Sequence, residues 1–458
     1  MITEIRLNNF KSFEASRLKM SRVTFLIGAN ASGKSNVLEA LKFASWMGHG
    51  DRLDDIEKRL GKSGSIRGGV RNLFLCGQKA VVAGDTTAPI VGVGPSAKEF
   101  KIGFDVTSET KGYRFEQTIR EHEFSDTSRH LVVSAEELAC VGQRQPLFRI
   151  KPNGTSADSE AVKVAWDNGK SGGQRPVVTC SNRRAIFQQM KDDDRFGMKP
   201  GTSPVANASR ALAEILDNIH FVSPDVSKMR GYVQIQSGVR LDEDGGNLSS
   251  VIYDLCKNKK TKSQLTEFIR AIPEQNIRSI QFVRTSANDV MVALAEGFAA
   301  FESTPASILS DGTLRVLAIG AALFSATAGA TVVIEEVDNG IHPSRAKHLV
   351  SQFYDIAAAR DIQIVLTTHN PALMDAVPQD ELPNVLCAYR DPETLTSCIR
   401  RLGDMPQYDN LALRGSLGGA ATDEELERMV TDHRTDEDIR REHVAWIEDF
   451  MSVRGGVS

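Results

Sequence analysis

The 458-residue sequence has no uninterrupted apolar run of the roughly 18 residues that a membrane-spanning helix requires. Its first residues, MITEIRLNNFKSF, lack the apolar segment of a secretory signal and begin with strand-like alternation. The six cysteines are widely scattered without a CxxC pair, which argues against a disulfide framework and against a zinc site. We therefore expect a cytoplasmic protein in a reducing compartment, with no membrane partner.

The sequence also lacks a large excess of either charge, since 55 basic residues face 59 acidic ones and the formal net charge is −4. A strongly basic chain would indicate nucleic-acid binding, and this composition does not. A local basic groove stays open, because net charge averages over all faces of a protein. Internal repeats and extended heptads are missing as well, which excludes long coiled-coil arms.

Hydrophobic patterning divides the chain into five parts. Apolar strands and amphipathic helices at both ends predict one α/β domain assembled from residues 1–98 and 277–410. Alternation between 99 and 180, as in KIGFDV and YRFEQTI, predicts an antiparallel β subdomain. We expect a helical insertion at 181–276 and an acidic helical tail at 411–458. The tail reads either as a solvated pair of surface helices or as a partner-binding element.

A phosphate-binding loop is the clearest local motif. GANASGKS, residues 28–35, follows the apolar strand VTFLIG and opens a helix, which is the context that G-x-x-x-x-G-K-[ST] requires. Glycines let such a loop turn tightly, so that backbone N–H groups point at phosphate oxygens. Lys34 would reach the β- and γ-phosphates, and Ser35 would offer its hydroxyl to Mg²⁺.

Polar side chains follow two further apolar strands. TVVIEE, residues 331–336, ends in two carboxylates, of which one would hold Mg²⁺ and the other would orient and deprotonate water. Successive strand residues point to opposite faces, so both roles are met only if the strand ends between the two acids. We assign Glu335 to the metal, where Asp is more usual, and Glu336 to the water. His369, after the strand IVLTT, would donate a hydrogen bond to the γ-phosphate.

Two segments compete as the loop that grips a γ-phosphate bound to a neighbouring subunit. Residues 171–174, SGGQ, are followed by Arg175 and Pro176, which oppose a helix at that point. The segment ILSDGTLRVLAIG, from residue 308, instead runs directly into an apolar helix, whose positive end favours an anion. We therefore select Ser310 and Gly312, and interpret SGGQ as a coincidence in a loop.

Taken in order, GANASGKS, LSDGT, VVIEEVDNGIHPS and LTTHNP resemble an ABC-type ATPase of the SMC and RecF kind. The chain resembles more closely the ATPase part of the bacterial OLD (overcoming lysogenization defect) family and its phage-defence relatives, the Septu and PARIS ATPases. ITEIRLNNFKSF and DGGNLSSVIYDL are also typical of that group. The resemblance covers about 1–50 and 220–400. It implies an ABC-type head, a mixed sheet with flanking helices, to which the β subdomain and helical insertion are added.

The resemblance also implies roles by position. Glu336 would be the general base, His369 the switch residue, and residues 338–342 the loop at a dimer interface, with His342 where many ABC proteins have Asp. Gln78, in LFLCGQ, is the candidate for the Q-loop glutamine. The residues implied in ATP and Mg²⁺ binding within one copy are Gly28, Asn30, Ala31, Ser32, Gly33, Lys34, Ser35, Asn36 and Glu335, and those from a second copy are Ser310 and Gly312.

These roles imply an ATP-hydrolysing switch that pairs head-to-tail around Mg-ATP, as a homodimer or a larger homo-oligomer. OLD proteins carry a C-terminal Toprim nuclease, and the residues after His369 contain no Glu-Gly strand-end motif. We therefore expect a nuclease or toxin on a separate partner in anti-phage defence. The alternative is a RecF-like DNA-binding ATPase in repair, using residues 257–262 (KNKKTK), Arg59, Arg67 and Arg71, although a solvated basic loop explains these as well. A transporter subunit fits poorly with the large insertion.

Overall fold

The computed structural model describes most of the chain. The described residues are 1–62, 65–81, 90–95, 97–108, 111–125, 127–152, 160–169, 174–199, 201–270, 277–297, 303–338, 343–406, 408–409, 411, 415–422, 425–432, 434, 438 and 441. Within this part of the chain, every helix is too short or too polar to cross a bilayer.

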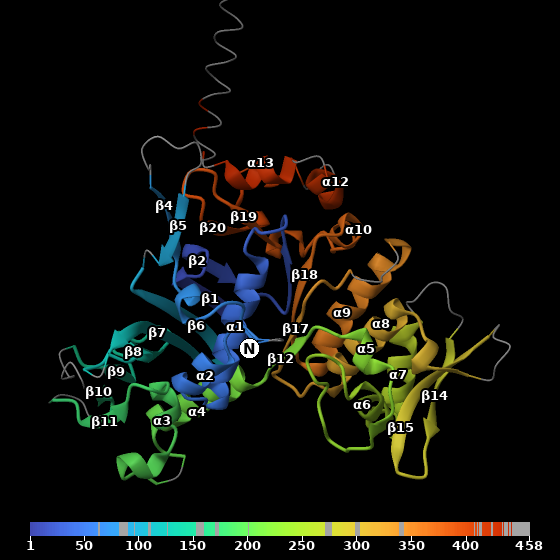
Figure 1. Ribbon diagram of the computed structural model, residues 1–458, viewed down its shortest axis with the longest axis horizontal. Coiled ribbons are helices and arrows are strands. Elements are labelled where there is room, and N and C mark those ends of the chain that lie inside the picture. The colour runs from blue at the N-terminus through green and yellow to red at the C-terminus, as the bar shows by residue number, and fades with distance from the viewer. Residues whose placement is uncertain are drawn as a thin grey trace, which may run out of the picture.

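A six-stranded mixed sheet forms the centre of the molecule (Figure 1). Its strands, in spatial order, are β12 (Ile219–Val222), β17 (Thr331–Ile334), β18 (Gln363–Thr368), β3 (Val23–Ile27), β19 (Leu386–Arg390) and β20 (Ser397–Arg401). The first five strands run parallel, and β20 is antiparallel to β19. Some neighbouring strands are distant in sequence, since Val23 of β3 pairs with Ile364 of β18.

An eight-stranded antiparallel sheet lies beside the mixed sheet. In spatial order its strands are β11 (Val177–Ser181), β10 (Ala161–Trp166), β9 (Phe148–Ile150), β8 (Arg129–Cys140), β7 (Lys111–Glu123), β6 (Glu99–Ser108), β1 (Ile2–Phe10) and β2 (Phe13–Lys19). The first two strands of the chain thus extend the sheet predicted from 99–180. Only residues 20–22 separate β2 from β3, so the antiparallel sheet is tied directly to the central strand of the mixed one.

Helices cover both faces of the mixed sheet, and smaller sheets lie at the edges (Figure 1). The helices are α1 (Lys34–His49), α2 (Leu53–Arg59), α3 (Ile186–Gln189), α4 (Pro204–Asp217), α5 (Val226–Met229), α6 (Leu248–Leu255), α7 (Lys259–Ile269), α8 (Asp311–Ser325), α9 (Ala346–Arg360), α10 (Pro371–Met374), α12 (Leu417–Thr422) and α13 (Glu425–Thr431). Short 3₁₀ turns span Val70–Leu73, Asp193–Phe196, Ala306–Ile308, Pro343–Arg345, Leu382–Asn384 and Leu402–Asp404. The remaining strands are β4 (Cys76–Val81), β5 (Ile90–Pro95), β13 (Val233–Gln234), β14 (Ile277–Arg284), β15 (Asp289–Glu296) and β16 (Thr304–Pro305).

The alternation of side chains along the parallel strands separates two hydrophobic cores. Phe25 of β3 and Val332 of β17 point into a core shared with α6–α9. Leu26 and Val333, one residue further along each strand, point into a second core shared with α1, α4 and the antiparallel sheet. Because every residue of β3, β17 and β18 is buried, these strands read as the continuous apolar runs that parallel sheets produce.

The predicted fold class, a mixed sheet with flanking helices together with an antiparallel β sheet, is confirmed. Residues 181–276, which were expected to form a helical insertion, also contain β12, an edge strand of the mixed sheet. In the same range, α6 and α7 pack against α8 and against the sheet of β13, β14 and β15. Within the helical tail expected at 411–458, the described residues include α12 and α13.

Candidate functional site

The loop between β3 and α1 is held by two glycines that no other residue could replace without rearrangement. Gly28 has φ 144°, and a Cβ there would lie 2.1 Å from the carbonyl oxygen of Ala388. Gly33 has φ 112°, and its Cβ would lie 2.6 Å from Ser397 Oγ. The loop is therefore clamped against β19 and the start of β20, and it delivers its residues to the N-terminus of α1.

A cleft of about 860 Å³ opens over this loop. It brings together most of the residues that the motifs predict, although they come from three neighbouring parallel strands. The predicted residues in its lining are Asn30, Ala31, Ser32, Gly33, Lys34, Ser35, Asn36, Glu335, Glu336 and His369. Gly28 instead lines a smaller cavity of about 250 Å³ behind the loop, which α13 closes with Leu426 and Val430. The volume of the cleft is that of a small-molecule site.

Lys34 is folded back onto its own loop. Its Nζ donates hydrogen bonds to the carbonyl oxygens of Gly28, at 2.5 Å, and Ala29, at 2.8 Å. Burial lowers the pKa of the Lys34 ammonium from its ordinary value, and the carboxylates of Glu336 and Asp338 oppose that shift. When a phosphate enters the cleft, Lys34 Nζ can replace its hydrogen bonds to these carbonyl oxygens with hydrogen bonds to phosphate oxygens.

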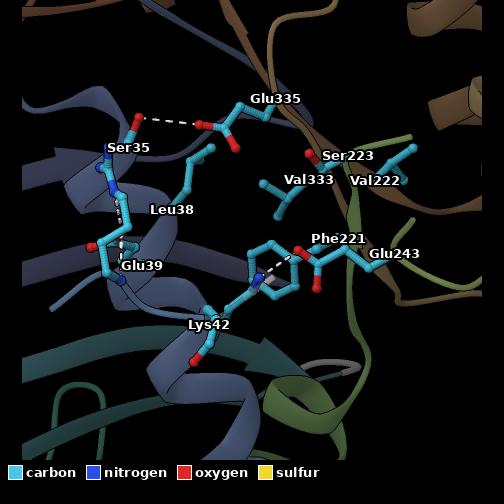
Figure 2. A pocket seen from close by; sticks show the side chains of 12 residues that line it. Ser35, Leu38, Glu39, Lys42, Phe221, Val222, Ser223, Glu243, Val333 and Glu335 are labelled. Carbon is cyan, nitrogen blue, oxygen red and sulfur yellow. Dashed lines mark hydrogen bonds and ion pairs between the residues drawn. The ribbon is translucent and has the colours of Figure 1, made fainter. Parts of the chain in front are cut away.

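Ser35 and Glu335 lie close together, although they follow β3 and β17, which are separated by β18 in the sheet. Ser35 Oγ, in the first turn of α1, donates a hydrogen bond of 3.1 Å to Glu335 Oε1 (Figure 2). A hydroxyl and a carboxylate are hard oxygen donors, which suit Mg²⁺ better than a softer metal. This donor set therefore fits the ion predicted for these two residues.

A second cavity of about 280 Å³ lies on the other side of this pair, between α1 and β12 (Figure 2). Lys42 of α1 forms an ion pair of 2.5 Å with Glu243 and lies 5.1 Å from the centre of the Phe221 ring. The segment that leads into α6 is thus connected to the helix that begins at the phosphate-binding loop.

The strand β17 ends at Ile334, immediately before the two acids. Glu336 takes a left-handed backbone conformation, φ 49°, and its N–H donates a 2.9 Å hydrogen bond to Thr367 Oγ1. This turn out of the strand lets Glu335 and Glu336 line the same cleft, which was the geometric condition for their two roles.

Asp338 contacts His369, which the sequence did not indicate. Its Oδ2 lies 3.5 Å from His369 Nδ1, and its Oδ1 is buried without a hydrogen-bond partner among the described residues. The carboxylate can hold the imidazole in one orientation, with Nε2 directed elsewhere. Residues 339–342, including His342, lie outside the described part of the chain.

Ser310 is not part of the cleft lining in its own copy. It is the N-cap of α8, where its Oγ accepts a 3.2 Å hydrogen bond from Thr313 N. Arg230 braces the turn by donating to Leu309 O and Asp311 Oδ1. Ser310 is exposed, Gly312 is half-buried, and neighbouring Ile308 is 65% exposed. The loop therefore faces outward, where a second molecule can reach it.

Two parts of the cleft wall were missed from the sequence. Lys11 and Arg67 both form ion pairs with Glu39 of α1, at 2.5 and 2.7 Å, and both line the cleft. The turn between β19 and β20 supplies another wall, with Arg390, Glu393, Thr394, Leu395, Thr396 and Ser397. No local motif marks either wall, because each depends on pairing between distant segments.

Other predicted residues fall outside the site or outside the described residues. Gln78 lies in β4, and its side chain is not among those described, as is also true of residues 171–173 of SGGQ. Of the basic residues considered for DNA, Arg59 forms an ion pair with Asp51, and Lys257 with Asp254. Arg67 belongs to the cleft, and Arg71 is exposed on the 3₁₀ turn beside it. Arg59, Arg67 and Lys257 are thus engaged by neighbouring acids.

Two families of known domains match the chain. Residues 1–51 match the family described as AAA ATPase domain. Residues 246–375 match the family described as AAA domain, putative AbiEii toxin, Type IV TA system. The first match contains the phosphate-binding loop, and the second contains Ser310, both acids and His369. The matched segments thus carry the predicted residues of the cleft, and the enzyme class of the chain is that of an ATPase.

Among characterised proteins, the chain is similar to a Helicobacter pylori protein named ATP/GTP phosphatase, with 22% identity over 387 residues, 83% of this chain and 88% of that protein. Among solved structures it is similar to an SMC head bound to the C-winged helix domain of ScpA, with a TM-score of 0.48, 13% identity, and coverage of 87% of this chain and 97% of that one. It is also similar to the SMC head domain from Thermotoga maritima, with a TM-score of 0.41, 12% identity, and coverage of 87% and 98%.

Proposed function

We propose that this ATPase is a molecular switch: two copies pair head-to-tail around Mg-ATP, and hydrolysis changes the pair and thereby controls a separate effector. One observation carries the proposal. Lys34, Ser35 and both acids line one cleft, whereas Ser310 faces outward from a different part of the same copy. A site in which the γ-phosphate is also gripped by Ser310 is completed only by a second copy.

The chain's own side chains supply most of the chemistry. Lys34 neutralises the β- and γ-phosphates, and Ser35 and Glu335 hold the ion. When bound, Mg²⁺ would offset the charge that develops on the phosphoryl oxygens. Glu336 orients and deprotonates water, and His369, held by Asp338, donates to the γ-phosphate. Ser310 adds its hydroxyl and the positive end of α8 from the partner copy.

The effector is proposed to be a nuclease or toxin of a bacterial anti-phage system. Support comes from the motif order, which resembles the OLD, Septu and PARIS ATPases, and from the description of the family matched at 246–375, which names a putative toxin and a toxin–antitoxin system. If a gene on either side of this one encodes a nuclease or toxin that binds the ATP-loaded protein, that product is the proposed effector. A transporter membrane subunit in that place would contradict it.

Mixing two inactive variants tests the composite site. Lys34→Ala removes the phosphate-binding lysine, and Ser310→Asp opposes the γ-phosphate with a negative charge while keeping a good N-cap residue. Half of randomly mixed dimers are heterodimers in which one of two sites is complete, so about a quarter of the wild-type phosphate release should return on mixing.

The matched control is a mixture of Lys34→Ala with Glu336→Gln. Both residues belong to the same cleft, so every site in that heterodimer lacks one of them, and activity should not return. If the first mixture stays inactive while each variant folds, or if both mixtures recover equally, the head-to-tail arrangement is wrong.

A further inference from the structure

Leu395 combines exposure, a disfavoured backbone conformation and a place in the cleft. It is 45% exposed, it has a left-handed backbone conformation with φ 56°, and it lines the cleft over the phosphate-binding loop. A bulky side chain is disfavoured at such a φ, where glycine or asparagine fits without strain. Strained residues gather where a side chain must be presented in a fixed direction.

The surrounding turn over-determines this conformation. Asp391, which is buried, accepts hydrogen bonds at its Oδ1 from Glu393 N, at 2.9 Å, and Thr394 N, at 2.8 Å. The N–H of Leu395 donates to Asp391 O, and its carbonyl oxygen accepts from Arg390 Nε, both at 2.9 Å. The backbone of Leu395 is thus held in this conformation by hydrogen bonds across the whole turn.

The turn is also fixed to the phosphate-binding loop. Ser397 Oγ occupies the space in front of Gly33, and Ser397 N donates a 2.8 Å hydrogen bond to Ser12 O. Leu395 stands two residues before Ser397, and both line the cleft that contains Gly33. A nucleotide with its phosphates at Gly33 can therefore direct its ring toward the turn that carries Leu395.

We infer that Leu395 is the base-contacting residue of the site, an apolar wall on which the ring of the bound nucleotide lies. This inference rests on the proposed function, because it takes the occupant of the cleft to be a nucleoside triphosphate. Half-buried Leu75 and Cys76 contribute further apolar lining. An aliphatic contact with a ring face does not distinguish one purine from another, since every base presents such a face. The wall therefore sets affinity for purine nucleotides without choosing between adenine and guanine.

Equilibrium binding by the full chain tests this with three ligands: Mg-ATP, Mg-GTP and inorganic tripolyphosphate, which has neither ribose nor base. Leu395→Ala should weaken both nucleotides about five- to tenfold, as expected when a half-buried leucine contact shrinks to a methyl group. Tripolyphosphate should bind unchanged. Leu395→Met, which keeps apolar reach, should stay within about twofold of wild type for all three. Val177→Ala, at a position on β11 with a similar exposed fraction, 41%, is the control for a general surface effect.

Leu395→Gly separates a base contact from a purely structural role. It removes both the strain and the contact, so its Tm should equal or exceed that of wild type while nucleotide affinity falls as in Leu395→Ala. The inference is overturned if Leu395→Ala binds both nucleotides as wild type does, or if tripolyphosphate weakens in parallel. A wild-type protein that neither binds nor hydrolyses ATP would instead overturn the proposed function.

Discussion

At the scale of single residues, burial and neighbouring charges shift the pKa of the Lys34 ammonium in opposite directions. Partial burial lowers its pKa below the ordinary value of 10.5, and the nearby carboxylates only offset part of that shift. Phosphate binding requires the charged form, so the affinity for Mg-ATP should begin to fall on the alkaline side before pH 10.5 is reached. Binding titrations across this pH range check the expectation. Lys34→Ala should bind Mg-ATP weakly, and its affinity should show no fall on the alkaline side.

The same shift has a consequence for stability. A lysine whose pKa is lowered in the folded state binds its proton more strongly when unfolded, so its contribution to stability is unfavourable below the folded pKa and disappears as pH rises through both values. Lys34→Met should therefore raise the free energy of unfolding at pH 7, by an amount that fades at high pH. Equal gains at both pH values in denaturant titrations would contradict this assignment.

Individual residues of the site were predictable to the extent that their roles are local. Lys34 and Ser35 belong to one contiguous motif, and Glu335 and Glu336 follow one apolar strand. The pairing of Asp338 with His369 and of Lys11 with Glu39 joins separate segments, so no spacing in the sequence marks it. Leu395 could not be predicted as a site residue, because a leucine in the sequence gives no indication of a left-handed backbone conformation.

At the scale of elements, the start of α8 has both a structural and a functional role. Ser310→Ala loses the cap on Thr313 N and should cost about 1 kcal/mol of stability as well as activity. Ser310→Asp keeps the cap, so its stability should stay within about 0.5 kcal/mol of wild type, and yet its negative charge should abolish hydrolysis. Urea titration alongside phosphate release measures both effects, and a fully active Ser310→Asp would remove the serine from the site.

The packing of α1 on α4 predicts that replacing Gly48 by alanine destabilises the protein, although helix propensity alone favours alanine. Alanine is favoured over glycine inside a helix, but a Cβ at Gly48 of α1 would lie 2.4 Å from the backbone nitrogen of Asp217. Gly48→Ala should therefore destabilise the protein by about 2 kcal/mol or more. Gly320→Ala in α8 is the matched comparison, since a Cβ there meets only side-chain atoms of Leu265 and Phe268, at 2.8 and 3.0 Å, which can move. Its cost in urea denaturation should be clearly smaller.

The helices and strands themselves were largely predictable, because strong periodicity is a local property. The apolar helix expected directly after Ser310 appears as α8, from Asp311 to Ser325. The partners of each strand were not predictable. Residues 1–10 read as a strand, but their place beside β6 in the antiparallel sheet depends on register with a segment about a hundred residues away.

At the scale of the whole molecule, the outward face of the Ser310 loop predicts nucleotide-dependent association. Glu336→Gln should bind Mg-ATP without hydrolysing it and should therefore accumulate as a dimer in sedimentation velocity experiments. Adding Ile308→Lys places a charge on an exposed isoleucine beside Ser310 and should weaken that dimer at least tenfold. Val283→Lys, on another exposed apolar side chain, is the control. Dimers that form equally without nucleotide, or that tolerate the lysine, would point to a different interface.

The central position of β3 has a consequence for biosynthesis. Its neighbours β18 and β19 are translated more than three hundred residues later, as the pairing of Val23 with Ile364 shows. At about 5–20 residues per second, a ribosome needs roughly 20 to 70 seconds to supply them. During that interval the apolar segment VTFLI has emerged without the two strands that flank it in the folded sheet. A prematurely terminated product, lacking β18 and β19, would be unable to assemble the ATP site.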